Sequence, residues 1–181
     1  MKYIVVDLEA TCWESNKDKH MEIIEIGAVK LNEKYEKIDT FQAFVKPILN
    51  PTLTTYCKQL TTIKQEDVDS ASIFNAVLTD LRVWLGGAWA ETIAENLFCS
   101  WGRYDRNQLI EDCILHRQIF PFNNKHINIK SVFVQIMKVK HCGMCAALNI
   151  LNMEREGPVH RGLSDAINTA RIFKRIKEGQ V

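Results

Sequence analysis

The chain has 181 residues, of which 46% are hydrophobic and 25% are charged, and its net charge is +1. These values are typical of a single globular domain over residues 1–181, and they argue against a protein that binds duplex nucleic acid mainly through a large positive charge. No apolar run has the roughly 20 residues of a membrane span, and the first residues lack the pattern of a signal peptide. We therefore expect a cytoplasmic protein with no membrane partner.

Three segments near the N-terminus predict three β-strands. Residues 2–9 and 21–31 are apolar runs, and residues 38–46 alternate between polar and apolar side chains before Pro47. We expect these strands to form an antiparallel meander, followed by an irregular stretch that begins at Pro47.

Helical spacing predominates in the rest of the chain. The segment T-I-K-Q at 62–65 has the form of a helix start, and from Ser72 apolar residues keep the 3.6-residue period until Gly86 and Gly87. A fourth strand is expected within residues 91–101. Further helices are expected over residues 104–117, 128–138, 143–151 and 162–177. This order predicts an α/β fold with a mixed β-sheet flanked by α-helices.

Four acidic residues lie at the ends of the expected elements. Asp7 and Glu9 are two apart at the end of the first strand, so their side chains point to the same side. Asp105 follows the fourth strand, and Asp165 lies in the first turn of the last helix, shortly after His160. Carboxylates that converge repel one another unless cations join them, and all-oxygen ligands favour Mg²⁺ or Mn²⁺. The pattern predicts a site for two divalent metal ions that supports phosphoryl transfer, with His160 as a base.

Each of these residues also has an ordinary structural interpretation. Asp165 would complement the dipole of the last helix, Asp105 would serve as an N-cap of the helix that follows it, and His160 would be structural. Two further acids, Glu22 and Glu25, lie in the apolar run of the second strand. For those two we favour a satisfied or edge-facing carboxylate without a catalytic role.

The cysteines favour reduced, buried thiols over disulfides. The one pair with motif spacing is H-C-G-M-C at 141–145, which contains Cys142 and Cys145. A structural zinc site needs four ligands and the chain has no second C-x-x-C, so zinc is disfavoured. A thiol-dependent redox protein that uses this pair remains a rival interpretation.

Three motifs resemble those of the DEDDh (DnaQ-like) 3′→5′ exonuclease family in order and spacing. They are D-L-E-A-T at 7–11, Y-D at 104–105, and H-x-x-x-x-D at 160–165, and the match spans residues 3–177. Within this family, the chain resembles the branch of RNA-trimming enzymes that contains the histone-mRNA 3′ exonuclease. Part of this resemblance lies in the segment Q-L-T-T-I-K-Q-E-D-V at 59–68. The resemblance implies an RNase H-like fold, with the first three strands antiparallel and further strands parallel.

The same resemblance implies a role for each motif residue. Asp7 would bridge two divalent metal ions, Mg²⁺ or Mn²⁺, and Asp105 would support the second ion. Glu9 and Asp165 would complete the first metal site. His160 would deprotonate the water that attacks the terminal phosphodiester.

The resemblance also implies residues that hold the terminal nucleotide. Ala10 and Thr11 after the first acids, with Ile63 of the 59–68 segment, would contact it, and Trp101 and Trp13 are candidates for stacking on a base. The implied activity is hydrolysis of single-stranded nucleic acid from its 3′ end to nucleoside 5′-monophosphates, with RNA favoured over DNA. The alternative is a non-catalytic nucleic-acid-binding or scaffold protein on the same fold.

Two positions depart from the family pattern. Many members follow the last Asp with a second acid, whereas this chain has Ala166, and Thr62 stands where Gly is commoner. Neither position is one of the five expected catalytic residues, so we expect an active enzyme.

Overall fold

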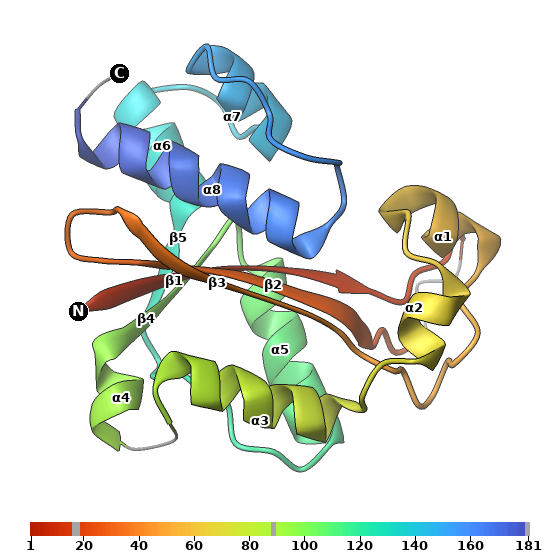
Figure 1. Cartoon of the computed structure of the whole chain (residues 1–181). Coiled ribbons are helices and arrows are strands. Elements are labelled where there is room, and N and C mark those ends of the chain that lie inside the picture. The colour runs from red at the N-terminus through yellow and green to blue at the C-terminus, as the bar shows by residue number, and fades with distance from the viewer. Residues whose placement is uncertain (16–18, 88–89, 180–181) are drawn as a thin grey trace.

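The structure is a computed structural model that describes residues 1–15, 19–87 and 90–179 (Figure 1). In these residues a five-stranded sheet has the order β3-β2-β1-β4-β5. The antiparallel strands β1, β2 and β3 form the predicted meander, and β4 and β5 run parallel to β1. The strands are Lys2–Ala10 (β1), Ile23–Leu31 (β2), Lys37–Phe44 (β3), Asn96–Ser100 (β4) and His126–Asn128 (β5). The predicted mixed sheet is confirmed.

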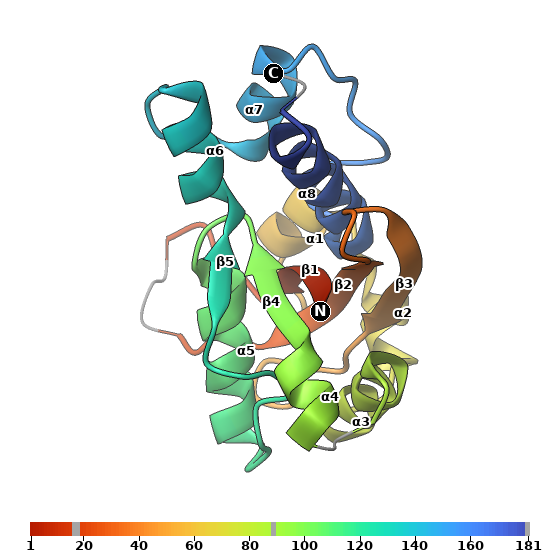
Figure 2. The same cartoon turned by 90° about the vertical axis from the view of Figure 1, so that its left-hand side faces the viewer.

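Helices cover both faces of this sheet. Figure 2 shows α6, α7 and α8 together on one side, with α3 and α4 on the other. The helices are Thr55–Thr61 (α1), Gln65–Asp69 (α2), Phe74–Leu85 (α3), Ala90–Glu95 (α4), Tyr104–Leu115 (α5), Ile129–Met137 (α6), Met144–Ile150 (α7) and Gly162–Lys177 (α8). The helix after Ser72 and the later predicted helices are confirmed, whereas the short elements α1, α4 and β5 were not predicted.

One predicted helix start is wrong. Thr62 does not begin a helix but is the left-handed C-cap of α1, with φ of 61°. The next helix, α2, begins at Gln65, and the backbone N–H of Lys64 donates to the Asp67 carboxylate at 2.9 Å. The capping box of α2 therefore consists of Lys64 and Asp67. The T-I-K-Q pattern places it two residues earlier, at Thr62 and Gln65.

Alternation along β1 separates two of the hydrophobic clusters of the core. Ile4, Val6 and Leu8 point to the face covered by α3 and α5, where they pack in one hydrophobic cluster. Val5 points to the opposite face and packs in a cluster with residues of α6, α7 and α8. Because Asp7 shares the parity of Val5, the acidic residues of β1 face the side of the sheet that α8 covers.

A pair of glycines sets the distance between α8 and the sheet. A Cβ atom on Gly27 of β2 would lie 2.0 Å from the carbonyl carbon of Gly162, and a Cβ on Gly162 would lie 3.0 Å from the carbonyl oxygen of Asp7. The backbones therefore touch where α8 begins, over the end of β1 (Figure 1). This contact brings the first turn of α8, with Asp165, to the acids of β1.

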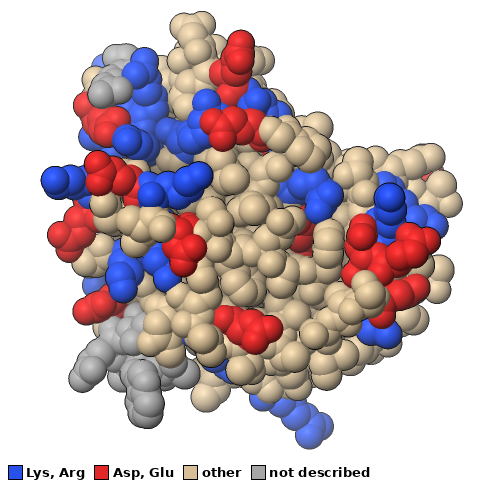
Figure 3. Space-filling model, viewed as in Figure 1, with Lys and Arg blue, Asp and Glu red and all other residues tan. Residues whose placement is uncertain are grey.

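Charged groups of both signs are mixed on the surface. On the face in Figure 3, Lys and Arg side chains alternate with Asp and Glu side chains instead of forming one basic surface. This distribution agrees with the small net charge of +1. In the described part of the chain, no helix is long and apolar enough to cross a membrane.

Candidate active site

The predicted acidic residues converge on one cavity from three elements. Asp7 and Glu9 come from β1, Asp105 from the first turn of α5, and Asp165 from the first turn of α8. With His160 they line a cavity of about 430 Å³. The other lining residues are Leu8, Trp101, Tyr104, Gly143, Met144, Cys145 and Val159.

Asp105 links the start of α5 to β1. Its carboxylate accepts a hydrogen bond from the backbone N–H of Leu8 at 3.1 Å, which joins the start of α5 to β1 between the two acids of that strand. The N-cap of α5 is Arg103, and Asp105 lies inside the first helical turn. The alternative in which Asp105 is an N-cap is therefore wrong.

A hydrogen bond joins His160 to Asp165 at the N-terminus of α8. The backbone N–H of His160 donates to Asp165 Oδ2 at 3.2 Å, and Asp165 Oδ1 forms an ion pair with Arg155. His160 is exposed and has a φ of 54°, a left-handed conformation that is uncommon outside glycine. One ligand atom each of Glu9, His160 and Asp165 lies within 4.8 Å of the others. The imidazole thus lies within reach of two carboxylates.

Three carboxyl groups of the cavity, those of Asp7, Glu9 and Asp105, have pKa values raised above their ordinary range. Burial, followed by the charges of Asp165, Glu25 and Asp105, raises the pKa of Glu9 to about 8. Burial is also the largest cause that raises the pKa of Asp105 to about 6. The pKa of Asp7 is raised well above its usual value by burial and then by the Asp105 and Asp165 charges. Crowded carboxyl oxygens of this kind fit hard divalent cations, because bound cations would offset the repulsion.

Trp101 is the one predicted nucleotide-binding residue that lines the cavity. Its ring packs against Phe133, with ring centroids 5.7 Å apart, and it is half-buried. Tyr104, which sequence reasoning did not assign to the substrate, lines the same cavity. Two aromatic side chains therefore border the acidic groups.

The remaining predicted substrate residues lie outside this cavity. Ala10 and Thr11 are buried, and the Thr11 hydroxyl accepts a hydrogen bond from the backbone N–H of Glu22 at 2.9 Å. Ile63 is fully buried in a separate cluster beside α1 and α2. Trp13 is half-buried, with the Lys19 ammonium 5.2 Å from its ring centroid. The contacts of these residues with a nucleotide stay predictions.

The structural interpretation of Glu22 and Glu25 is confirmed. The Glu22 carboxylate accepts hydrogen bonds from the backbone N–H groups of residues 48–50, at 2.6 to 2.9 Å. Glu25 pairs with Arg161 at 3.0 Å and accepts from the backbone N–H of Gly162 at 3.1 Å. Glu25 therefore anchors the start of α8 without lining the cavity.

Sequence reasoning missed several residues of the site. Tyr104 belongs to the motif Y-D, and Cys145 belongs to the segment H-C-G-M-C. Their positions in these motifs were the available signal that they lie near the site. Arg155 and Val159 precede His160 in a segment where no pattern marked them. Cys142 and Cys145 are free thiols, and Cys145 lines the cavity.

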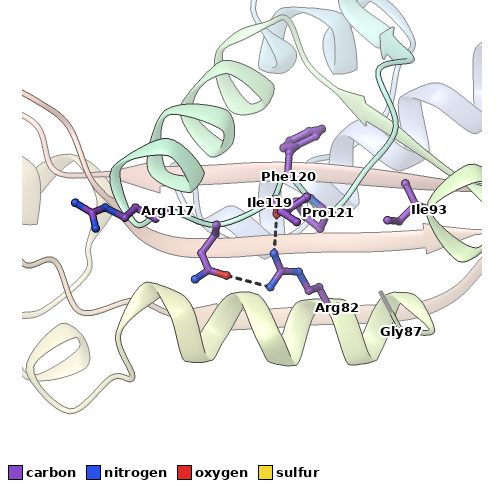
Figure 4. Close-up of a pocket in the computed structure, with 8 residues that line it drawn as sticks. Arg82, Gly87, Ile93, Arg117, Ile119, Phe120 and Pro121 are labelled. Carbon is purple, nitrogen blue, oxygen red and sulfur yellow. Dashed lines mark hydrogen bonds between the residues drawn. The ribbon is translucent and has the colours of Figure 1, made fainter. Parts of the chain in front are cut away.

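A second cavity of similar size lies on the other side of the sheet, and none of its described lining residues is acidic. It has a volume of about 410 Å³, and Arg82 donates to the Gln118 side chain at 3.2 Å and to the carbonyl of Ile119 at 2.6 Å (Figure 4). Its described lining residues are Arg82, Gly87, Ile93, Arg117, Gln118, Ile119, Phe120 and Pro121. Because this set offers no carboxylate, the cavity at β1 and α8 is the candidate for metal-dependent chemistry.

Comparison with known proteins agrees with this geometry. The RNase T family, described as Exonuclease, matches residues 4–173. The chain is 35% identical to 3'-5' exoribonuclease 1 of Rattus norvegicus, over 95% of this chain and 52% of that protein. It is 33% identical to ERI1 exoribonuclease 2 of Homo sapiens, over 98% of this chain and 29% of that protein. The nuclease domain of 3'hExo, a DEDDh family member bound to rAMP, has a TM-score of 0.87 at 33% identity, covering 98% of this chain and 92% of that one.

The chain therefore belongs to the RNase T exonuclease family, of the DEDDh type. It spans 52% and 29% of the two curated relatives described above.

Proposed function

We propose that the chain is a metal-dependent 3′→5′ exonuclease that acts on single-stranded nucleic acid, with RNA as the favoured substrate. The observation that carries the proposal is the convergence of four carboxylates and one histidine on a single cavity. Family membership supports the reaction class, and the names of the curated relatives, which are exoribonucleases, support RNA.

The acidic residues would hold two divalent cations, Mg²⁺ or Mn²⁺. We assign Asp7 to both ions, Glu9 and Asp165 to one, and Asp105 to the other. When bound, the cations would supply positive charge for the attacking and leaving oxygens of a phosphodiester. The protein contributes by holding its carboxylates in place, as Asp105 does through the backbone of Leu8.

His160 would act as the general base. Its exposed ring lies beside Glu9 and Asp165, so water can approach it from solvent. The base would take a proton from the attacking water as the new oxygen–phosphorus bond forms. The bond to the 3′ oxygen would break at the same time, and that oxygen would gain a proton from solvent water. The products are a nucleoside 5′-monophosphate and a chain that is one nucleotide shorter.

Family membership supports an exonuclease over an endonuclease, and the size of the cavity is compatible with it. A volume of about 430 Å³ suits a ligand of the size of one nucleotide. Trp101 and Tyr104 would offer aromatic surfaces to the terminal base, and such stacking tolerates every base. The base identity at the 3′ end should therefore affect cleavage only modestly.

The experiment compares 5′-labelled single-stranded RNA and DNA of equal length and sequence, with Mg²⁺, Mn²⁺ or EDTA. We expect a ladder that shortens from the 3′ end with either cation, faster on RNA, and intact substrate in EDTA. Binding without shortening under every condition would instead support a non-catalytic nucleic-acid-binding protein. Activity that persists in EDTA would contradict the metal-dependent mechanism.

A further inference from the structure

Arg155 makes an unusual set of contacts at the edge of the acidic cavity. It lies between α7 and α8, and its side chain is 19% exposed. One guanidinium forms an ion pair with Asp165 Oδ1 and donates to the carbonyl oxygens of Gly157, at 3.2 Å, and Pro158, at 2.5 Å. Its remaining terminal nitrogen lies 3.9 Å from the Cys145 sulfur. A planar guanidinium can make these contacts together because its five N–H groups point in fixed directions.

These contacts connect the segment that carries His160 to a carboxylate of the site. Residues 156–160 are exposed, so little packing holds them. At one end of the segment, Asn168 of α8 bonds to the backbone N–H of Glu156 at 3.0 Å and to its carbonyl at 2.7 Å. The middle of the segment is held by Arg155 through two carbonyl groups. Arg155 is therefore placed to determine how firmly His160 is presented to the cavity.

The same guanidinium is the positive charge in contact with Asp165. A divalent cation that binds Asp165 must share this carboxylate with Arg155 or displace it. Two positive charges a few ångströms apart repel each other at an intermediate dielectric constant. Arg155 therefore opposes cation binding while it orders the segment beside the cation site.

We propose that Arg155 is a positioning residue with two opposed effects: it anchors the His160 segment and it competes with the divalent cation for Asp165. The inference rests on the proposed function, since it takes Asp165 as a cation ligand and His160 as the base. It does not require Arg155 to contact the substrate.

The first variant, Arg155→Met, removes the positive charge and the planar guanidinium group and keeps an unbranched apolar side chain. Mn²⁺ affinity, measured by calorimetry without RNA, is expected to increase about tenfold because the competing charge is gone. Turnover at saturating Mn²⁺ is expected to fall at least about tenfold, with KM changed less than about threefold, because the base is no longer held in place. A residue with a merely structural role would lower both quantities.

The second variant, Arg155→Lys, separates charge from anchoring. Lysine keeps a positive charge near Asp165 but has a single flexible ammonium instead of the planar fork. We expect Mn²⁺ affinity within about threefold of the parent and turnover as low as in Arg155→Met. Full turnover in Arg155→Lys would overturn the anchoring half of the proposal.

Arg171→Met is the matched control. Arg171 donates to the carbonyl of Glu154 and pairs with the exposed Glu156, so it contacts the same segment. Among the described residues it makes no ion pair with Asp165. We expect this variant to leave Mn²⁺ affinity within about twofold of the parent. A gain in affinity equal to that of Arg155→Met would mean that general charge removal, and not competition at Asp165, is responsible.

Amide hydrogen exchange of the metal-free protein tests the anchoring without catalysis. Exchange in residues 156–160 is expected to be faster in Arg155→Met than in the parent, and unchanged exchange would overturn the anchoring. Unchanged or weaker Mn²⁺ binding in Arg155→Met would overturn the competition. If the parent protein binds Mn²⁺ but leaves RNA intact, the proposed function fails, whereas affinity and exchange still decide whether Arg155 anchors and competes.

Discussion

The carboxyl groups of Asp7, Glu9 and Asp105 have raised pKa values in the folded protein, chiefly because burial removes water from them. Between the ordinary carboxyl range near pH 4 and a pH of about 8, the metal-free folded state binds protons that the unfolded chain has released. Linkage then requires the contribution of these carboxyl groups to the stability of the metal-free protein to fall as pH rises through this window. Bound cations should restore stability at the upper end.

Asp7→Asn tests this electrostatic cost. The substitution removes one charge from the crowded group at nearly constant shape, so in EDTA at pH 8 its melting temperature is expected to exceed that of the parent. Turnover is expected to be lost, and the stabilisation by Mn²⁺ should be smaller than in the parent. Thermal denaturation in EDTA and in Mn²⁺ gives the melting temperature without metal and the stabilisation by Mn²⁺. A lower melting temperature in EDTA would show that Asp7 is required for the fold.

His160 combines a proposed chemical role with an unfavourable backbone conformation. Both His160→Ala and His160→Gly remove the imidazole, so both are expected to lower turnover by about 10² to 10⁴. At the φ of 54°, Gly avoids the steric cost that Ala incurs, so His160→Gly should be the more stable variant by about 1 kcal/mol. Turnover within about threefold of the parent in both variants would make His160 structural, and loss of Mn²⁺ binding would make it a ligand.

At the scale of elements, short helices depend on their caps. Thr62 is exposed, ends α1 with φ of 61°, and is β-branched, so it pays a steric cost at a position that glycine occupies freely. Thr62→Gly is expected to raise the free energy of unfolding by about 1 kcal/mol in urea titrations. Thr55→Gly, at an exposed helical position of the same helix, should lower it. Equal effects at the two positions would contradict the assignment of Thr62 as a left-handed cap.

The contact between α8 and β2 depends on Gly27. An added methyl group would overlap the backbone of Gly162, so Gly27→Ala must displace the start of α8. We expect a loss of more than about 2 kcal/mol of stability, together with weaker Mn²⁺ binding, because Asp165 moves with the helix. Gly143→Ala is the control for the loss of stability, since a Cβ there meets nothing within 4 Å. Normal Mn²⁺ affinity in Gly27→Ala would show that α8 does not set the geometry of the acids.

Sequence patterns predicted the long elements and, among the short ones, α7 and β4, but not α1, α4 or β5. The apolar periodicity of α3, α6 and α8 is a local property, so it is visible without the fold. By contrast, α1 has seven residues and β5 has three, and elements so short are stable only through tertiary contacts. The acids of the site were recognisable from the order of their motifs.

The contacts between distant residues around the site could not be predicted from the sequence. The close backbone contact between Gly27 and Gly162 joins residues far apart in the chain. Nothing in the local sequence pattern around either glycine indicates this contact. The ion pair of Arg155 with Asp165 likewise depends on the path of the segment between α7 and α8. Both relations arise from tertiary packing, which periodicity does not encode.

At the scale of the whole molecule, the fold gathers four acidic residues in one cavity of a nearly neutral protein. The net charge is +1, and acidic and basic groups are mixed on the face in Figure 3. Long-range attraction of a nucleic-acid duplex is therefore weak, and substrate must be held at the cavity itself. This arrangement fits an enzyme that recognises the end of a single strand.

Product analysis on a 3′-labelled single-stranded RNA, with a circular RNA of the same sequence beside it, decides whether the converging acids form an exonuclease site. With Mn²⁺, we predict that the parent protein releases labelled nucleoside 5′-monophosphate as the first product and leaves the circle intact, and that Asp7→Asn releases none. Linearisation of the circle, or labelled oligonucleotides as the first products, would contradict the proposed 3′→5′ exonuclease.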